Sequence, residues 1–343
     1  MKELLNVLYV LTPDAYLGKD GQCVSVRIEG QSPRRLPIQG IEGIVCLGRV
    51  NASPFLMAMC AEHGVALTWM TENGRFLASV HGETRGNVLL RRQQYRWADD
   101  PGRSAAVARF ILKGKLGNAR TVLRRGARDT RDEGRVAPLT AAADTITAAL
   151  TRLDRETDLD GLRGVEGDAG ATYWGAFPAL IGNAGPAFVF AGRNRRPPLD
   201  AVNCLLSFVY TLLAHDVRSA LEGVGLDPYV GFLHRDRPGR ASLALDMMEE
   251  LRPVLADRLV LSLINRRQVA AEGFKTLDSG AVVMTDDTRR TVIDAWQTRK
   301  RETIRHPFLN EDTEIGLLPH LQSLLLARHI RGDLDGYPAL LWP

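Results

Sequence analysis

Short apolar runs separated by turn residues fill roughly the first eighty positions of the chain. They predict β-strands over residues 4–10, 23–28, 43–47, 65–70 and 76–80. Asp20-Gly21 and Asn73-Gly74 predict hairpin turns, because both pairs tolerate positive φ. Ser53-Pro54 predicts a helix start, with the serine as cap and the proline at the first helical position. This region therefore predicts a small β-rich N-terminal domain, which we place at residues 1–87.

From about residue 88 onward, apolar positions recur with a helical period instead. The pattern predicts helices over residues 104–116, 140–153, 199–221, 254–264, 288–303 and 317–329. Asp100-Pro101-Gly102 predicts a turn before the first of these helices. The predicted fold class is α+β: a small β-rich N-terminal domain followed by a larger all-α C-terminal domain at residues 88–343.

One further helix, between Gly231 and Pro253, carries an unusual set of carboxylates. Ser242 is a candidate N-cap, and Pro253 limits the far end. At about 100° per residue, Asp246, Glu249 and Glu250 cover one narrow face. The opposite, core-facing side carries Leu243, Met247, Met248 and Leu251.

A histidine precedes this helix on a loop, at His234. An imidazole and carboxylates that converge on one point can hold a hard divalent ion, and oxygen-rich ligation suits Mg²⁺ or Mn²⁺. The alternative is plainer: acidic residues opposite an apolar stripe are usually a solvated face, and a lone histidine is usually not a ligand. The pattern alone leaves both interpretations open.

Composition narrows the class of protein. The 343 residues are enough for two domains, and 45% hydrophobic with 24% charged residues argues against wholesale disorder. No apolar stretch is long enough to span a bilayer, and the N-terminus lacks a signal-peptide pattern. The four cysteines are scattered without a CxxC pair, which argues against a disulfide framework or zinc site. We therefore expect a cytoplasmic protein with no membrane partner.

Positive charge is concentrated in one segment of the chain and is not spread evenly along it. Residues 85–135 hold 14 Lys and Arg against 5 Asp and Glu, whereas the whole chain has a net charge of only +4. Such a belt suits double-stranded DNA, although a solubilising helix surface has the same pattern. The candidate DNA-binding residues of this basic belt are Arg91, Arg92, Lys113, Lys115, Arg124 and Arg125.

Three other features allow two interpretations each. Arg240, before the acidic helix, could meet a phosphate or be an ordinary helix-flanking arginine. The loop at Arg193–Arg196 could hold backbone phosphates, but we favour an exposed linker. Tyr173 and Trp174 could stack on bases, but aromatics at this spacing are mostly core residues.

The segment around His234 and the acidic helix resembles the signature of the CRISPR-associated adaptation integrase, the family called Cas-one and also known as CRISPR-associated endonuclease. A second segment, Arg163–Trp174, fits the same family, as do the lead-in Leu226–Phe232 and the tail Arg331–Pro338. The order Glu, His, Asp-x-x-Glu extends over 84 positions, from 166 to 249. The pattern at the C-terminal end of the chain looks most like the subtype I-C branch of this family.

This resemblance implies roles for individual residues. The metal ligands would be Glu166, His234 and Glu249, with Asp246 as an additional catalytic carboxylate. One departure matters, since the pair Glu249-Glu250 leaves open whether Glu250 substitutes for Glu249. We expect the three ligand side chains to lie within coordination range of one another even without metal. We expect Asp246 to act through another ligand or at a second, weaker metal site.

The resemblance also implies the activity and the partners. The expected protein is a Mg²⁺- or Mn²⁺-dependent DNA integrase and endonuclease that inserts short DNA fragments into a CRISPR array, in a prokaryotic cytoplasm. It would be a homodimer through its N-terminal domain, assembled with a small second CRISPR-associated protein, Cas-two. Two alternatives stay open: a general metal-dependent nuclease for branched or damaged DNA, and a non-enzymatic DNA-binding scaffold.

Overall fold

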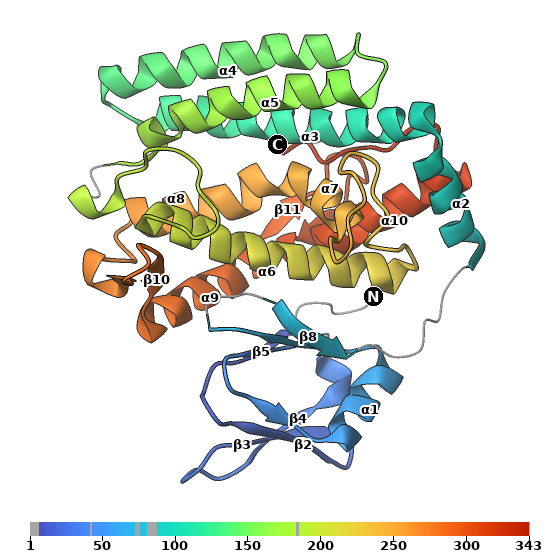
Figure 1. Ribbon diagram of the computed structural model, residues 1–343, viewed down its shortest axis with the longest axis vertical. Helices are drawn as coiled ribbons and strands as arrows, with labels where there is room; N and C mark the ends of the chain where they lie inside the picture. The colour runs from blue at the N-terminus through green and yellow to red at the C-terminus, as the bar shows by residue number, and fades with distance from the viewer. Residues whose placement is uncertain (1–6, 42, 73–75, 81–87, 183–184, 343) are drawn as a thin grey trace. The chain divides into compact units, whose positions relative to one another are not determined.

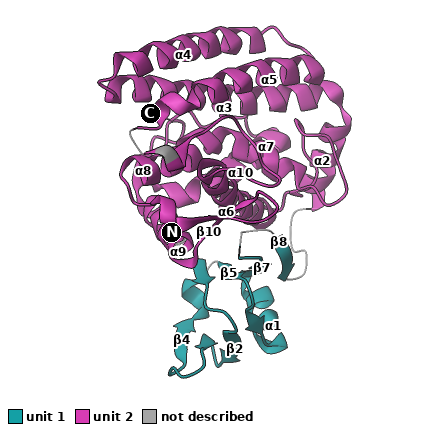
Figure 2. Cartoon of the chain, turned by 60° about the vertical axis from the view of Figure 1, so that its left-hand side comes forward, with its two compact units in different colours: residues 1–86 teal, residues 87–343 magenta. Residues whose placement is uncertain are grey.

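A computed structural model describes residues 7–41, 43–72, 76–80, 88–182 and 185–342 of the chain (Figure 1). Two compact units divide it, residues 1–86 and residues 87–343 (Figure 2). The sequence pattern placed this division between residues 87 and 88.

Unit 1 contains two small sheets and one helix. The first sheet has the order β1-β5-β7-β8, formed by Val7–Val10, Gly43–Leu47, Ala66–Met70 and Phe76–Val80. The second has the order β4-β3-β2-β6, formed by Arg34–Pro37, Cys23–Arg27, Tyr16–Asp20 and Asn51–Ala52. Helix α1, Pro54–His63, adds Leu56, Met59 and Cys60 to the shared apolar core. Two mixed sheets around one core give a β-rich unit, as predicted.

Most local signals in unit 1 were predictive. Ser53 caps α1 by accepting a hydrogen bond from the Leu56 N–H at 3.2 Å. The Asp20-Gly21 turn joins β2 to β3, with Gly21 at φ 60°. Asn73-Gly74 lies outside the described residues. Strands β2, β4 and β6 were not predicted, because their polar residues mask the apolar period that identifies a buried strand.

Unit 2 is mostly helical. Its α-helices are α2 (Val88–Asp99), α3 (Pro101–Asp129), α4 (Glu133–Leu153), α5 (Leu159–Ala176), α6 (Ala201–Val224), α7 (Ser242–Leu251), α8 (Arg258–Asn265), α9 (Asp286–Arg301) and α10 (Leu318–Arg331). A π-helical turn, Arg252–Asp257, joins α7 to α8. Short 3₁₀ turns occupy Phe177–Leu180, Pro186–Phe188, Ala271–Gly273 and Ile315–Leu317.

Unit 2 corrects the sequence-based fold in three places. Two short antiparallel hairpins interrupt the all-α domain, β9-β10 (Phe274–Thr276 and Val282–Met284) and β11-β12 (Thr303–Arg305 and Asp312–Glu314). Asp100-Pro101-Gly102 is not a separate turn but the start of α3, because the Asp100 carboxylate caps the Gly102 and Arg103 N–H groups. Helix α5 was not predicted, since its glycines weaken the helical pattern. Its N-cap Asp158 and its packing against α3 and α4 stabilise it.

Helix α3 organises the part of unit 2 that matters for function. It packs against α4, α5 and α7, while α6 packs against α7 and α10 (Figure 1). Gly114 of α3 permits a close approach to α7, because a Cβ at this position would lie 2.9 Å from the Glu250 Cβ. Helix α7 is therefore enclosed by α3 on one side and α6 on another.

Candidate metal centre

Helix α7 is buried along its length except at Leu245, which is partly exposed. The exposed fractions are 0% for Asp246, 3% for Glu249 and 0% for Glu250, so the carboxylates do not form a solvated face. Ser242 is not the N-cap: Ala241 takes that position, and the Ser242 hydroxyl donates to the Arg235 carbonyl at 3.3 Å. The α-helix ends at Leu251 before Pro253, but the chain continues helically through the π turn. Three buried carboxylates on one short helix require strong partners.

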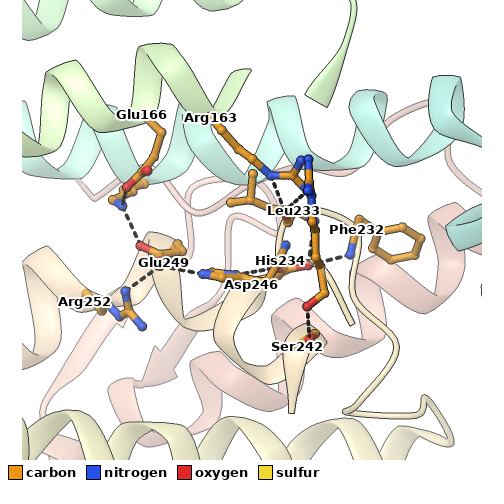
Figure 3. Close-up of polar contacts among 11 residues, drawn as sticks. Arg163, Glu166, Phe232, Leu233, His234, Ser242, Asp246, Glu249 and Arg252 are labelled. Atoms are coloured by element: carbon orange, nitrogen blue, oxygen red, sulfur yellow. Dashed lines mark hydrogen bonds and ion pairs between the residues drawn. The ribbon is translucent and has the colours of Figure 1, made fainter. Parts of the chain in front are cut away.

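Asp246 is fully engaged by the loop that carries His234 (Figure 3). Its carboxylate accepts hydrogen bonds from the N–H groups of Phe232 at 2.6 Å, Leu233 at 2.9 Å and His234 at 3.0 Å. It also accepts one from the His234 Nδ1 at 2.6 Å. Because an ionised carboxylate can only accept, the ring nitrogen Nδ1 donates in this bond, and the other ring nitrogen, Nε2, is directed away from Asp246.

The loop can approach α7 so closely because Gly231 has no side chain. A Cβ there would lie 2.8 Å from the Asp246 Oδ2 and 2.8 Å from the Ser242 Cβ. From the other side, Arg163 on α5 donates through Nε and Nη2 to the Leu233 carbonyl, at 3.0 and 2.6 Å. The loop is therefore held from two helices, which fixes where the His234 ring lies.

Glu249 is a buried carboxylate with cationic partners. Arg252, one turn later, contacts its Oε1, and the Lys115 Nζ lies 2.8 Å from its Oε2. The His234 Nε2 is 4.0 Å from Oε1. Burial alone would raise the pKa of Glu249, but Arg252 and Lys115 outweigh it and lower the pKa to about 2. Glu249 is therefore ionised at any physiological pH.

Glu166 on α5 reaches the same place from a third element. Its Oε1 contacts the Lys115 Nζ, which thereby bridges Glu166 and Glu249. Burial lowers the pKa of the Lys115 ammonium, but the attraction of Glu249 and Glu166 outweighs burial and leaves that pKa raised. Two carboxylates from different helices thus share one ammonium group.

Glu250 faces away from this centre. Its carboxylate accepts from the Leu340 N–H at 2.8 Å, the Gln322 Nε2 at 3.0 Å and the Tyr337 hydroxyl. Burial raises the pKa of Glu250 to about 7, although these hydrogen bonds oppose the rise. The structure therefore places Glu249, and not Glu250, beside Glu166 and His234.

The donors suit a divalent cation, but they are not assembled as a ready-made cage. Within the described ranges, no three His, Cys, Asp or Glu side chains lie together in an arrangement that could hold a metal ion. The expected coordination range without metal is therefore not observed, because Lys115 lies between Glu166 and Glu249. The Glu249 Oε2 is buried without an aligned hydrogen bond. Two carboxylates and an imidazole nitrogen still match Mg²⁺ or Mn²⁺.

Two cavities meet at this group of residues. The wider one has a volume of about 410 Å³ and includes Arg163, Arg235, Arg237 and Arg240 in its wall. The second, of about 300 Å³, extends past Lys115, Trp174, Arg195 and Tyr210. Glu166, His234, Glu249 and Arg240 line both cavities. Arg240 thus faces the site, where a phosphate could approach it.

An aromatic layer supports the second cavity. Tyr173 and Tyr210 donate to the buried Asp257 carboxylate at 2.8 and 2.6 Å, and the Arg252 guanidinium lies 5.2 Å from the centre of the Tyr210 ring. Burial raises the pKa of Asp257 to about 6, against the effect of these hydrogen bonds. Trp174 packs against Tyr173 in a T-shaped contact at 5.1 Å. Tyr173 is buried, as the core interpretation expects, whereas Trp174 is only partly buried, and both side chains line the second cavity.

The basic belt does not form one uniform surface. Lys113 and Arg124 on α3 are ion-paired with Asp154 and with Asp144, and Arg125 pairs with Asp129. The side chains of these three residues are 38%, 54% and 52% exposed. Arg91 and Arg92 lie on α2. Lys115 does not belong with them: it points into the carboxylate cluster, with 19% of its side chain exposed.

The loop at Arg193–Arg196 is partly anchored. Arg193 donates to the Asn203 Oδ1 at 2.6 Å and to the Ser207 Oγ at 3.2 Å, both on α6. Arg195 is exposed and lines the second cavity. The linker interpretation therefore holds for Arg196, which is exposed, but not for Arg193.

Sequence reasoning missed three residues of this centre. Arg252 could have been found as the i,i+3 partner of Glu249 on a helix. Arg163 stands one turn before Glu166, yet nothing in the sequence links it to the Leu233 carbonyl. Lys115 was counted with the basic belt, because its position two residues from Lys113 gives no signal that it points inward.

The chain has clear relatives in sequence. The chain is 52% identical over 342 residues to the CRISPR-associated endonuclease Cas1 1 of Chlorobaculum tepidum, covering 100% of both chains. It is 50% identical over 346 residues to the CRISPR-associated endonuclease Cas1 2 of Rhodospirillum rubrum, again with full coverage. These likenesses define the class, the CRISPR-associated proteins. Within it the chain belongs to the Cas1 family, since the family pattern for CRISPR associated protein Cas1 matches residues 8–298. Membership in the subtype I-C branch stays a prediction.

Solved structures share the fold at low sequence identity. A CAS1 protein from Thermotoga maritima superposes with a TM-score of 0.83 at 22% identity, over 95% of this chain and 97% of that one. A casposase bound to integration product gives 0.84 at 19% identity, over 99% and 95%. The described part of the chain has no helix with the length and apolar character needed to cross a membrane.

Proposed function

We propose that the protein is a Mg²⁺- or Mn²⁺-dependent DNA integrase and endonuclease of CRISPR adaptation. It would join the 3′-hydroxyl of a short DNA fragment to a phosphodiester of the CRISPR array. The observation that carries the proposal is the meeting of Glu166, His234 and Glu249, from three separate segments, at the junction of two cavities. The names of its endonuclease relatives and the shared fold of a casposase bound to integration product support it.

Each residue has a defined task in this reaction. A divalent ion at Glu166, Glu249 and the His234 Nε2 would act as Lewis acid toward the phosphate and would favour deprotonation of the attacking hydroxyl. Asp246 keeps the Nδ1 proton in place, so that Nε2 presents its lone pair to the centre. Arg237 and Arg240 line the wider cavity and offer positive charge to phosphate oxygens. Water in place of the 3′-hydroxyl would give hydrolysis at the same residues.

The proposal includes partners and a location. We expect a homodimer through the β-rich unit, two such dimers flanking a dimer of the Cas-two protein, and a prokaryotic cytoplasm. A solved Cas6-RT-Cas1–Cas2 complex contains a chain that shares this fold with a TM-score of 0.83 at 20% identity, over 100% of this chain and 36% of that one. The partner is therefore tested by mixing the two purified proteins and measuring the mass of the assembly.

The activity is tested with a short duplex bearing free 3′-hydroxyls and a supercoiled plasmid that contains the array. With Mn²⁺ or Mg²⁺ we expect a joined product that is larger than the fragment, and with a chelator we expect none. Shortened strands without a joined product would favour the general nuclease. DNA binding without any metal-dependent product would favour the scaffold.

The basic belt is tested through the salt dependence of DNA binding. Charge reversal of Arg91, Arg92, Arg124 and Arg125 should weaken binding to all sequences alike. Each lost phosphate contact should reduce the slope of log K against log salt by about 0.9. An unchanged slope after all four reversals would show that the belt does not hold the DNA backbone. Reversal of Arg34 and Arg35, two arginines of β4 in unit 1, is the control for reversal of Arg91 and Arg92 alone, because both pairs change the charge by the same amount.

A further inference from the structure

Lys115 holds an unusual position for a lysine on a long helix. Its Nζ contacts the Glu166 Oε1 and lies 2.8 Å from the Glu249 Oε2, so three helices, α3, α5 and α7, meet at one ammonium group. Only 19% of the Lys115 side chain and 4% of the Glu249 side chain are exposed. The contact is therefore an internal ion pair and not a surface salt bridge.

Charge explains why a cation must be present at this point. Two carboxylates brought together in a buried site repel one another unless a positive group neutralises them. Arg252 neutralises Glu249 at Oε1 only, which leaves Oε2 and the Glu166 carboxylate to Lys115. The ammonium thus occupies the point that the two carboxylates share.

The contact is also replaceable. The Glu249 Oε2 has no aligned hydrogen bond even though Lys115 is close, so charge rather than directional bonding holds the pair. A cation with different ligand geometry can meet the same oxygens. The His234 Nε2 lies 4.0 Å from the Glu249 Oε1, whereas the Lys115 ammonium contacts the Glu166 Oε1 and the Glu249 Oε2, so this nitrogen is a further donor that a metal ion can use and the ammonium does not contact.

We propose that Lys115 holds the place of the divalent ion in the metal-free protein and leaves this place when the ion binds. The inference rests on the metal centre of the proposed function. An ammonium and a divalent cation repel strongly at the distance of one shared carboxylate, so both cannot keep the same oxygens. The flexible four-carbon stem of lysine allows the ammonium to move without a change in the helix.

The structure offers a destination for the displaced group. Lys115 itself lines the second cavity, of about 300 Å³, together with Arg195, Tyr210 and Arg252. In the metal-bound protein the ammonium faces this cavity and adds positive charge beside the centre. Metal binding would therefore convert an internally neutralised site into one that attracts a phosphate.

The test is Mn²⁺ binding to the full-length protein without DNA, measured by the electron paramagnetic resonance of free Mn²⁺. Lys115→Met removes the competing ammonium and should tighten Mn²⁺ binding about tenfold or more, because charge repulsion no longer opposes the ion. Glu166→Gln should weaken binding in either background. Lys300→Met is the matched control: it removes another buried ammonium, which pairs with Asp216 on α6 at 2.7 Å, and should leave the Mn²⁺ affinity unchanged.

Thermal unfolding provides a second readout. Without metal, Lys115→Met should melt at a lower temperature than the wild type, because two carboxylates lose their shared cation. Mn²⁺ should then raise its melting temperature more than that of the wild type, since a tighter ligand stabilises the folded state more. Lys300→Met should also lower the melting temperature without metal, but Mn²⁺ should raise the melting temperature of this variant no more than that of the wild type.

The outcomes separate the two proposals. If the wild type binds Mn²⁺ through Glu166 but Lys115→Met binds it equally or more weakly, the role of Lys115 is overturned and the metal centre stands. If no form binds Mn²⁺, both are overturned.

A further test uses the wild-type protein alone and therefore does not depend on the folding of a variant. Acetylation of Lys115, followed by mass spectrometry, should increase when Mn²⁺ is added, whereas acetylation of Lys300 should not. Unchanged or reduced acetylation of Lys115 would contradict the displacement.

Discussion

Glu249 and Glu250 are neighbours on α7, both buried, yet they lie in opposite environments. Glu249 meets two cations, Lys115 and Arg252, and its pKa falls to about 2. Glu250 meets uncharged donors, and its pKa rises to about 7. Charged partners favour the ionised carboxylate, whereas neutral donors only partly offset the cost of burial. The comparison shows how one helix carries a carboxylate paired with cations on one side and a carboxylate bonded to uncharged donors on the other.

The substitution with the largest expected effect tests this difference between Glu249 and Glu250 directly. Glu249→Gln should reduce strand transfer by about 10³-fold or more, because loss of a metal ligand removes several kcal/mol of transition-state stabilisation. Glu250→Gln is the matched control and should retain most activity, since its amide can still accept from the Tyr337 hydroxyl. Joining of a labelled fragment to the array plasmid measures both. Equal loss in the two variants would show that the sides of α7 are not functionally distinct.

Substitution of Asp246 tests whether Asp246 and Glu249 have the same role or different roles. Asp246→Asn should lower strand transfer by about 10–100-fold, with partial rescue by excess Mn²⁺, because it disturbs the orientation of His234 and not the ion itself. It should also cost about 1–3 kcal/mol of unfolding free energy, since an amide cannot accept from all four donors. Glu249→Gln should not be rescued. Equal loss and equal rescue would mean that both carboxylates act as one ligand pair.

The smallest effect concerns stability and pH. The pKa of Glu250 is raised on folding, so the folded state binds its proton more tightly than the unfolded state does. Stability from this group therefore falls as pH rises from about 4.5 to about 7 and is constant above. From pH 5 to pH 8, the wild type should lose about 2 kcal/mol more unfolding free energy than Glu250→Gln.

Urea denaturation at the two pH values measures this difference. Asp257, whose pKa is also raised, is present in both proteins and cancels in the comparison. Tyr337→Phe should lower stability by about 1 kcal/mol through the loss of one hydrogen bond, and should leave Mn²⁺ binding unchanged. An identical pH dependence in wild type and Glu250→Gln would show that Glu250 is ionised over this whole range.

Sequence signals predicted helix starts and tight turns correctly where a residue type has only one common local role. Ser53-Pro54 begins α1 and Asp20-Gly21 closes the β2-β3 hairpin, because caps and tight turns depend on neighbouring backbone groups alone. Asp100-Pro101 was misjudged, because the same residues that favour a turn also cap a helix. The glycine-rich α5 was missed, since its stability comes from contacts with α3 and α4 that no local pattern contains.

For the site, the residue types, their order from Glu166 to Glu249 and the resemblance to the family could be read from the chain alone. The choice between Glu249 and Glu250 required the fold, because a difference of one position on a helix turns a side chain by about 100°. The fold also shows that Lys115 lies in the carboxylate cluster and not with the rest of the basic belt. The direction of a side chain and the charge that it meets depend on helices far away in the chain, and these long-range contacts exist only in the folded protein.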